Sequence, residues 1–237
     1  MPFGYRYGYY FDPTYLLVLI GALISMFASM RVKTTFHKYA QMRSRTNMTG
    51  AQAAQRVLNS AGIYDVRIQH VAGDLTDHYN PKNKTLNLSD SVYGSTSVAA
   101  VGVAAHECGH AIQHQQGYSP LNFRSALVPV ANFGSAAAWP LIILGVIFGG
   151  AGNIFCQIGI LFFSAAVLFQ LVTLPVEFNA SSRAVRILGD TGILSEQELP
   201  YTRKVLKAAA LTYVAGAAAA ILQLLRLLLL FGGRDRD

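Results

Sequence analysis

Residues 97–117 read SVAAVGVAAHECGHAIQHQQG, a run of small and apolar side chains that leads into a His-Glu-Cys-Gly-His segment. Such a run predicts one continuous helix, and Gly117 is typical of the residue that follows a helix end. On an α-helix, residues four apart lie above one another, so His106 and His110 are expected to face the same point. Two histidines at this spacing, with Glu107 between them, form the HExxH pattern of two zinc ligands and a general base.

The chain is too apolar for a water-soluble globular protein. It has 237 residues, of which 52% are hydrophobic and 13% are charged, whereas soluble proteins average about 25% charged residues. The net charge is +7, but the basic residues flank apolar segments instead of forming a patch interleaved with aromatic residues. We therefore expect them to contact anionic lipid headgroups, and we expect no nucleic-acid partner. No disulfide is expected between Cys108 and Cys156.

Four segments are long and apolar enough to cross a bilayer, which takes about 20 residues in a helix. These segments cover residues 13–31, 126–148, 154–176 and 208–231. Residues 1–11 are rich in Tyr and Gly, as is typical of the membrane interface, and Asp12-Pro13 predicts the start of the first span. A cleavable signal peptide is the alternative for that span, but its basic residues follow the apolar run instead of preceding it.

The basic residues also indicate how the spans are oriented. Arg6 precedes the first span, whereas a group of basic residues follows it: Arg31, Lys33, Lys38, Arg43 and Arg45. The connector between the second and third spans, GGAGN, carries no charge. Because cytoplasmic loops carry an excess of Lys and Arg, the N-terminus is expected outside and the chain from residue 31 onward in the cytoplasm.

Residues 46–125 form a polar insert that carries the HExxH helix. A capping-box pattern predicts a further helix over residues 49–60, and alternating polarity predicts a strand over residues 65–71. Residues 76–88 are expected to form a β-hairpin around an Asn-Pro turn. An edge strand beside the zinc helix could bind an extended peptide by strand addition. A small sheet that only covers the helix is an equally good interpretation.

The remaining histidines are not expected to bind the same ion. His114 continues the line of His106 and His110, but it lies about 12 Å from His106 along the helix axis, too far to share one zinc. We therefore expect His114 to play a supporting or structural part. His70 and His78 lie in the predicted sheet, where surface or packing positions are the expected ones.

The third zinc ligand must come from outside the helix, since a catalytic zinc takes three protein ligands and an open position. Glu177 emerges where the third span meets the cytoplasm, and it is the one acidic residue between Glu107 and Asp190. A site of two histidines and Glu177 satisfies the required count. The alternatives for Glu177 are a carboxylate that caps the membrane interface or one that pairs with Arg183.

The whole chain resembles the YugP-like family of bacterial neutral zinc metallopeptidases. It is similar, more distantly, to the HtpX-type and CAAX prenyl-protease-type membrane peptidases. The segments that carry the resemblance are HECGHAIQH at 106–114, YNPKNKTLNLS at 79–89 and PVEFNASSRA at 175–184. HtpX-type peptidases place the third ligand in a Glu-x-x-Ala-Asp motif, and Glu177 matches its glutamate. Ser181 stands where that motif has aspartate, which weakens a supporting role for this position.

The resemblance implies a membrane-bound zinc metalloendopeptidase with one zinc per chain, held by His106, His110 and Glu177. Zinc would activate a water molecule, and Glu107 would take its proton and pass it to the leaving amine. A further hydrogen-bond donor should stabilise the oxyanion. The residues considered for this or another supporting role are Arg183, Asn179, His78 and His114.

The expected fold is a mostly α membrane protein with about four transmembrane helices and a small α+β, zincin-like domain at the cytoplasmic face. Its expected parts are an N-terminal anchor (1–31), a cytoplasmic part with the HExxH helix (32–125), a transmembrane hairpin (126–176), a cytoplasmic segment with the third ligand (177–207), and a C-terminal transmembrane helix and tail (208–237). The expected location is the bacterial plasma membrane, with several spans and a cytoplasmic active site.

Two other functions compete with this one. A catalytically silent membrane adaptor would keep the zinc fold and bind partner proteins. A site-2-type intramembrane protease would need HExxH within a true span and an Asp-Gly ligand motif in another span, whereas residues 97–117 are half polar and LGDTG at 188–192 follows the membrane. The expected partners are a peptide or protein substrate and the lipid bilayer, with a membrane-protein partner or a homo-oligomer left open.

Overall fold

The structure is a computed structural model, and it describes residues 12–149 and 153–232. The expected interfacial segment at residues 1–11 lies outside this described part, as do residues 150–152 of the uncharged connector and residues 233–237 of the tail. In chain order the elements are α1 (Tyr15–Ala40), α2 (Gly50–Ser60), β1 (Arg67–His70), β2 (His78–Asn80), β3 (Thr85–Leu88), α3 (Asp90–Tyr93), α4 (Val98–Gln115), α5 (Ser119–Gly149), α6 (Ile154–Asp190) and α7 (Leu199–Phe231).

The expected number of candidate spans is confirmed, because four helices in the described part of the chain are long and apolar enough to cross a bilayer. They are α1, α5, α6 and α7. Each extends beyond its apolar segment, and α6 joins the third span and the segment with Glu177 into one helix of 37 residues. A helix satisfies its own backbone hydrogen bonds in lipid and in water, so nothing requires it to end at the membrane surface.

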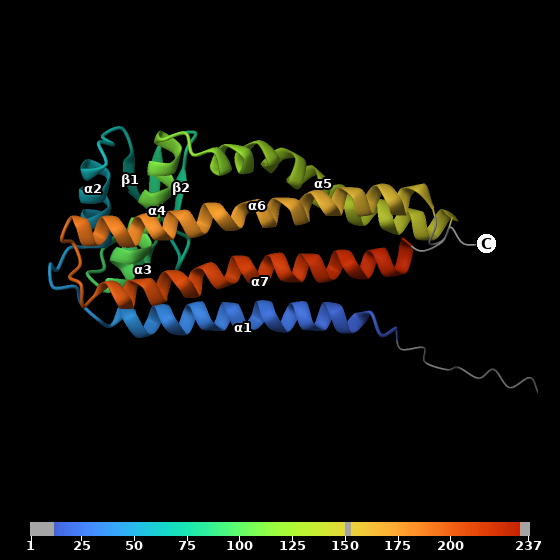
Figure 1. The fold of residues 1–237 in the computed structure, drawn as a ribbon, viewed down its shortest axis with the longest axis horizontal. Helices are drawn as coiled ribbons and strands as arrows, with labels where there is room; N and C mark the ends of the chain where they lie inside the picture. Colours follow the sequence, from blue (N-terminus) through green and yellow to red (C-terminus); the bar gives the residue numbers. More distant parts are fainter. Residues whose placement is uncertain (1–11, 150–152, 233–237) are drawn as a thin grey trace, which may run out of the picture.

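The long helices form a bundle with the small elements gathered at one end (Figure 1). In this bundle α1 packs against α7, α7 against α6, and α6 against α5. Helices α2 and α4 and the sheet lie at the end where α1 finishes and α7 begins. The start of α1 and the finish of α7 lie at the opposite end. The smaller helices and the sheet therefore lie together at one end of the bundle.

The sheet has three strands in the order β1-β3-β2. β2 pairs antiparallel with β3, with Tyr79 opposite Leu86, which confirms the expected hairpin. β1 pairs parallel with β3, with Ile68 opposite Leu86, a pairing for which the sequence contains no local signal. Central strand β3 is buried along its whole length. β2 is therefore an edge strand, and it contacts α4.

Helix α4 is the centre of the core, and it packs against α2, α6 and α7. Two glycines allow this close approach. A Cβ atom on Gly109 would lie 2.7 Å from the backbone oxygen of Ala180 on α6. A Cβ atom on Gly102 would lie 2.6 Å from Cγ2 of Thr202 on α7. These contacts fix α4 against the two helices that complete the site.

The predicted helix ends are mostly confirmed. Thr49 and Gln52 form the capping box of α2, and Gly117 follows α4 with φ of 62°. Two predicted starts differ. α1 begins at Tyr15, after a turn in which Asp12 accepts hydrogen bonds from Thr14. α7 begins at Leu199, well before the expected span at residues 208–231, and it follows a turn in which the Glu198 carboxylate accepts from the Ser195 N–H.

Candidate metal centre

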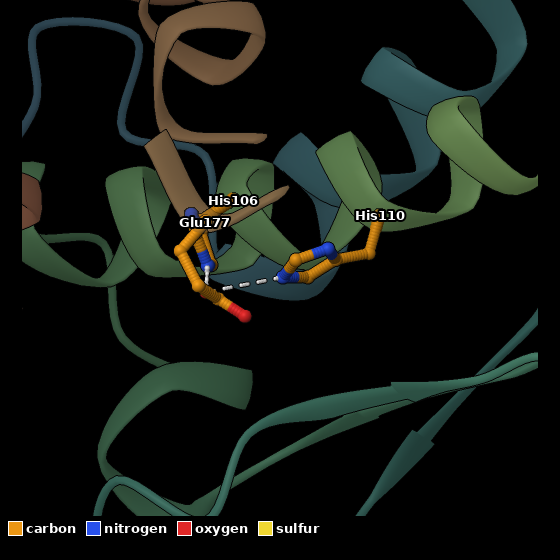
Figure 2. Close-up of side chains that lie close together, drawn as sticks. All are labelled: His106, His110 and Glu177. Carbon is orange, nitrogen blue, oxygen red and sulfur yellow. Dashed lines mark ion pairs between the residues drawn. The ribbon is translucent and has the colours of Figure 1, made fainter. Parts of the chain in front are cut away.

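Two helices bring three metal-binding side chains to one point. His106 and His110 project from one face of α4, and Glu177 projects toward them from α6 (Figure 2). Their ligand atoms all lie within 4.8 Å of one another. Oε2 of Glu177 lies 3.3 Å from Nε2 of His106 and 3.5 Å from Nε2 of His110. Two ligand atoms of a tetrahedral zinc ion, each about 2 Å from it, are about 3.3 Å apart. The group could therefore hold one metal ion.

The surroundings of Glu177 also fit a cation. The residue is 2% exposed, and its Oε2 atom is buried without a hydrogen-bond partner in the described part of the chain. A buried carboxylate oxygen without a partner is costly unless a positive charge compensates it. The alternative ion pair with Arg183 is not formed, since Arg183 donates to Asn179 and to Gln116.

Glu107 lies beside the ligands and is held by the sheet. Its Oε2 atom accepts the backbone N–H of Tyr79 at 2.9 Å, and the residue is 8% exposed. Tyr79 is in the middle of edge strand β2, so this hydrogen bond joins the edge of the sheet to the helix that carries the histidines. Glu107 can thus act on a water molecule near the ion without being one of the three ligands.

Each histidine is oriented through its second ring nitrogen. Nδ1 of His106 lies 3.1 Å from Oγ of Ser181, and Nδ1 of His110 lies 3.0 Å from Oε1 of Gln113. Such contacts fix the tautomer and leave Nε2 free for a metal. Serine in place of aspartate still allows a supporting contact at position 181, because the hydroxyl group reaches the His106 imidazole.

Gln113 is a supporting residue that the sequence analysis missed. It is completely buried, and its Nε2 atom donates to the carbonyl oxygen of Val176 at 2.9 Å and to Oδ1 of Asn179 at 3.0 Å. It therefore links His110 to the helix that carries Glu177. The available signal was its place three residues after His110, which puts the two side chains on one face of the helix.

The other supporting candidates have structural contacts. Asn179 and Arg183 connect α6 to Gln116 at the end of α4, and neither lines the cavities at the metal centre. His78 has both ring nitrogens engaged, Nδ1 with the Thr76 carbonyl and Nε2 with Asn87. Nδ1 of His114 lies 3.0 Å from the Tyr79 hydroxyl, so His114 braces β2 against α4 as a structural residue.

Two cavities meet at the metal centre. The smaller has a volume of about 230 Å³ and is mainly apolar, with walls from α1, α4 and α7. The larger has a volume of about 470 Å³ and more polar walls from β2, α4 and α5. In the described part of the chain, the residues that line both cavities are Asp77, Glu107, Glu177 and Tyr213. Neither Asp77 nor Tyr213 is among the site residues expected from the sequence.

Burial and nearby charges shift several pKa values at this site. Burial lowers the pKa of His110, but the carboxylates of Glu177 and Glu107 outweigh it, so the pKa lies above its ordinary value. Burial raises the pKa of Asp77, and Glu107 raises it further, against the hydrogen bonds from Ser89. Burial also raises the pKa of the Cys108 thiol well above its usual range, so this cysteine is not a ready metal ligand.

Comparison with known proteins supports this picture. The family model described as "Putative neutral zinc metallopeptidase" matches residues 14–232. A protein of Bacillus subtilis (strain 168) named "Putative membrane protease YugP" is 46% identical to the chain over 225 residues, which are 94% of this chain and 99% of that protein. No solved structure matches.

Proposed function

Because the chain belongs to this family of zinc metallopeptidases, and because two histidines and a buried glutamate converge on one point, we propose that it is a membrane-bound zinc endopeptidase. The observation that carries the proposal is the distance of 3.3 Å and 3.5 Å from Oε2 of Glu177 to the two imidazoles, with Glu107 next to them. His106, His110 and Glu177 are the proposed ligands of one zinc ion per chain. Glu107 is the proposed general base.

The proposed reaction uses the side chains around the ion in turn. When bound, zinc supplies a positive charge that polarises a peptide carbonyl and acidifies a water molecule. The Tyr79 N–H holds one carboxylate oxygen of Glu107, so the other oxygen can take the proton of the attacking water. Glu107 then passes this proton to the amine that leaves. Ser181 and Gln113 keep the two imidazoles in place throughout.

The substrate is proposed to bind as an extended peptide along β2. This strand is the edge of the sheet next to α4, and its residue Tyr79 lines the larger cavity. Main-chain hydrogen bonds to a sheet edge bind many sequences, which suits an endopeptidase. The proposed substrates are membrane-associated or cytoplasmic proteins.

The metal centre is proposed to face the cytoplasm, with the N-terminus outside. Support comes from the basic residues that follow α1 and from the arrangement of the bundle. The end of the bundle that carries α4 is the end at which α1 finishes and α7 begins (Figure 1). The start of α1 lies at the other end, which the same rule places outside.

The intramembrane alternative has less support. Helix α4, which carries HExxH, is not among the four candidate spans of the described chain. Asp190 of the LGDTG segment ends α6 and is not part of the metal-binding group. A measurement of turnover separates the silent adaptor from a peptidase.

The test combines zinc content with hydrolysis of fluorescently quenched casein by the detergent-purified protein. Wild type is expected to hold one zinc per chain and to cleave casein. Glu107→Gln is expected to keep its zinc and lose hydrolysis, because the amide cannot accept the proton. Glu177→Ala is expected to lose zinc, because it removes a ligand.

The matched control is Glu196→Gln, which makes the same change at an exposed position before α7 and is expected to keep both properties. Zinc without hydrolysis in wild type would favour the adaptor. Turnover by Glu107→Gln would remove Glu107 from the role of base, and a full zinc complement in Glu177→Ala would mean that the third ligand is another residue.

A further inference from the structure

The proposed reaction needs a hydrogen-bond donor near the ion, where the two cavities meet. A peptide carbonyl next to the ion gains negative charge on its oxygen as water adds, and a fixed donor at that oxygen stabilises the transition state. The four residues of the described chain that line both cavities face this place. Three of them, Asp77, Glu107 and Glu177, carry carboxylates, which accept hydrogen bonds when ionised. The fourth, Tyr213, carries a phenol that can donate one.

The three carboxylates are already engaged in other interactions. Asp77 accepts the N–H and the hydroxyl of Ser89, each at 2.8 Å, and so holds the loop before β2. Glu177 is directed at the two imidazoles, and Glu107 is held by Tyr79. None of these three groups is available to stabilise negative charge on a substrate.

The donors named from the sequence are also engaged elsewhere. Asn179 and Arg183 are hydrogen-bonded to each other and to the α4 residues Gln113 and Gln116. Neither Asn179 nor Arg183 lines either cavity. Both ring nitrogens of His78 have partners within the sheet region. These three side chains are therefore engaged elsewhere, and the donor to the substrate oxygen is expected on another element.

Tyr213 is placed for this task by its helix. It lies on α7, which packs against both α4 and α6, the two helices that carry the ligands. It lines both cavities together with Glu107 and Glu177, and the larger cavity together with Arg124, so it lies among the charged groups of the centre. The residue is partly buried, which limits competition from water.

We infer that Tyr213 is a catalytic residue that donates a hydrogen bond to the substrate oxygen on which negative charge develops. The phenol keeps its proton during the reaction, while Glu107 carries the proton from water to the leaving amine. This inference rests on the proposed peptidase function, and it names a residue that the sequence does not reveal.

The first test measures hydrolysis of quenched casein by zinc-loaded protein in detergent. Tyr213→Phe is expected to lower kcat about a hundred- to a thousandfold, as loss of one oxyanion donor does, with little change in KM or zinc content. The control is Tyr201→Phe on the same helix. Tyr201 stacks on Tyr39, which a phenylalanine ring can also do, so its activity should match wild type.

The second test does not depend on turnover. The probe is N-phosphoryl-Leu-Trp, whose tetrahedral phosphoryl oxygens carry the charge that the substrate oxygen develops. Calorimetry should show that Tyr213→Phe binds this probe about ten- to a hundredfold more weakly than wild type, since it lacks one hydrogen bond to a charged group. Zinc content is measured on the same samples.

The possible results distinguish failure of the role inferred for Tyr213 from failure of the proposed peptidase function. Unchanged kcat and unchanged probe binding in Tyr213→Phe would overturn the inference and leave the peptidase function in place. Loss of zinc by this variant would assign the phenol to holding Glu177, which also overturns it. A zinc-loaded wild type that neither cleaves casein nor binds the probe would contradict the peptidase function and, with it, the role of Tyr213.

Discussion

At the scale of single residues, the metal centre depends on side chains that do not touch the ion. Nε2 of each histidine is available because Nδ1 is held, by Ser181 on one ring and by Gln113 on the other. Gln113 makes two further hydrogen bonds, since it also donates to the Val176 carbonyl and to Asn179. Its amide therefore connects the geometry of a ligand on α4 to the backbone of α6.

This network predicts the effect of Gln113→Leu. The substitution keeps the side-chain size but removes the acceptor for His110 and the side-chain donor to the Val176 carbonyl. Zinc affinity should fall about ten- to a hundredfold, the usual effect of losing a partner of a ligating histidine. Competition with a fluorescent chelator measures it.

The matched control is Gln115→Leu, two residues further along α4 at an exposed position. It should bind zinc like wild type. Equal affinity in Gln113→Leu and Gln115→Leu would show that His110 is oriented without the buried amide.

At the scale of elements, the close packing of α4 against α6 brings the histidines to Glu177. Gly109 lies between His106 and His110 in the chain, at the point where the backbones of the two helices approach. The position has room for a hydrogen atom and not for a methyl group. The glycine is needed here for its size and not for a special backbone conformation.

The substitution Gly109→Ala should therefore move α4 away from α6. The added Cβ atom would lie 2.7 Å from the Ala180 carbonyl oxygen and 3.1 Å from its Cα, and backbone atoms cannot rotate away. We expect a lower melting temperature and weaker zinc binding, measured by thermal unfolding with and without a chelator.

Gly94→Ala provides the comparison for that experiment. A Cβ atom on Gly94 would meet nothing within 4 Å, and its φ of −96° is open to alanine. This variant should retain both the melting temperature and the zinc affinity of wild type. If Gly109→Ala also retained them, the two helices would have to be free to separate without disturbing the ligands.

At the scale of the whole molecule, the proposed orientation in the membrane predicts which side each part faces. Tyr64 lies in the polar insert and is 79% exposed, and the native Cys108 and Cys156 are both buried. A membrane-impermeant maleimide should therefore modify Tyr64→Cys in inverted vesicles and not in intact cells. A cysteine appended after Asp237 should show the reverse pattern. Labelling of Tyr64→Cys in intact cells would place the metal centre outside.

Much of the fold could be predicted because its signals are local. Long apolar segments predict the four candidate spans, since a helix must be long enough to cross the bilayer. The hairpin of β2 and β3 follows from a turn and its flanking residues. The parallel pairing of β1 with β3 could not be predicted, because nothing near either strand specifies a partner so distant in the chain.

The sequence alone determined the pair of histidines with Glu107, because the helical repeat places residues four apart on one face whatever surrounds the helix. Glu177 could be proposed because few acidic residues lie near the spans and because its motif resembles a known one. Only the tertiary structure decided how Gln113 and Ser181 support the site and which residues line both cavities. These contacts join α4, α6 and α7, and contacts between distant elements leave no periodic pattern in the chain.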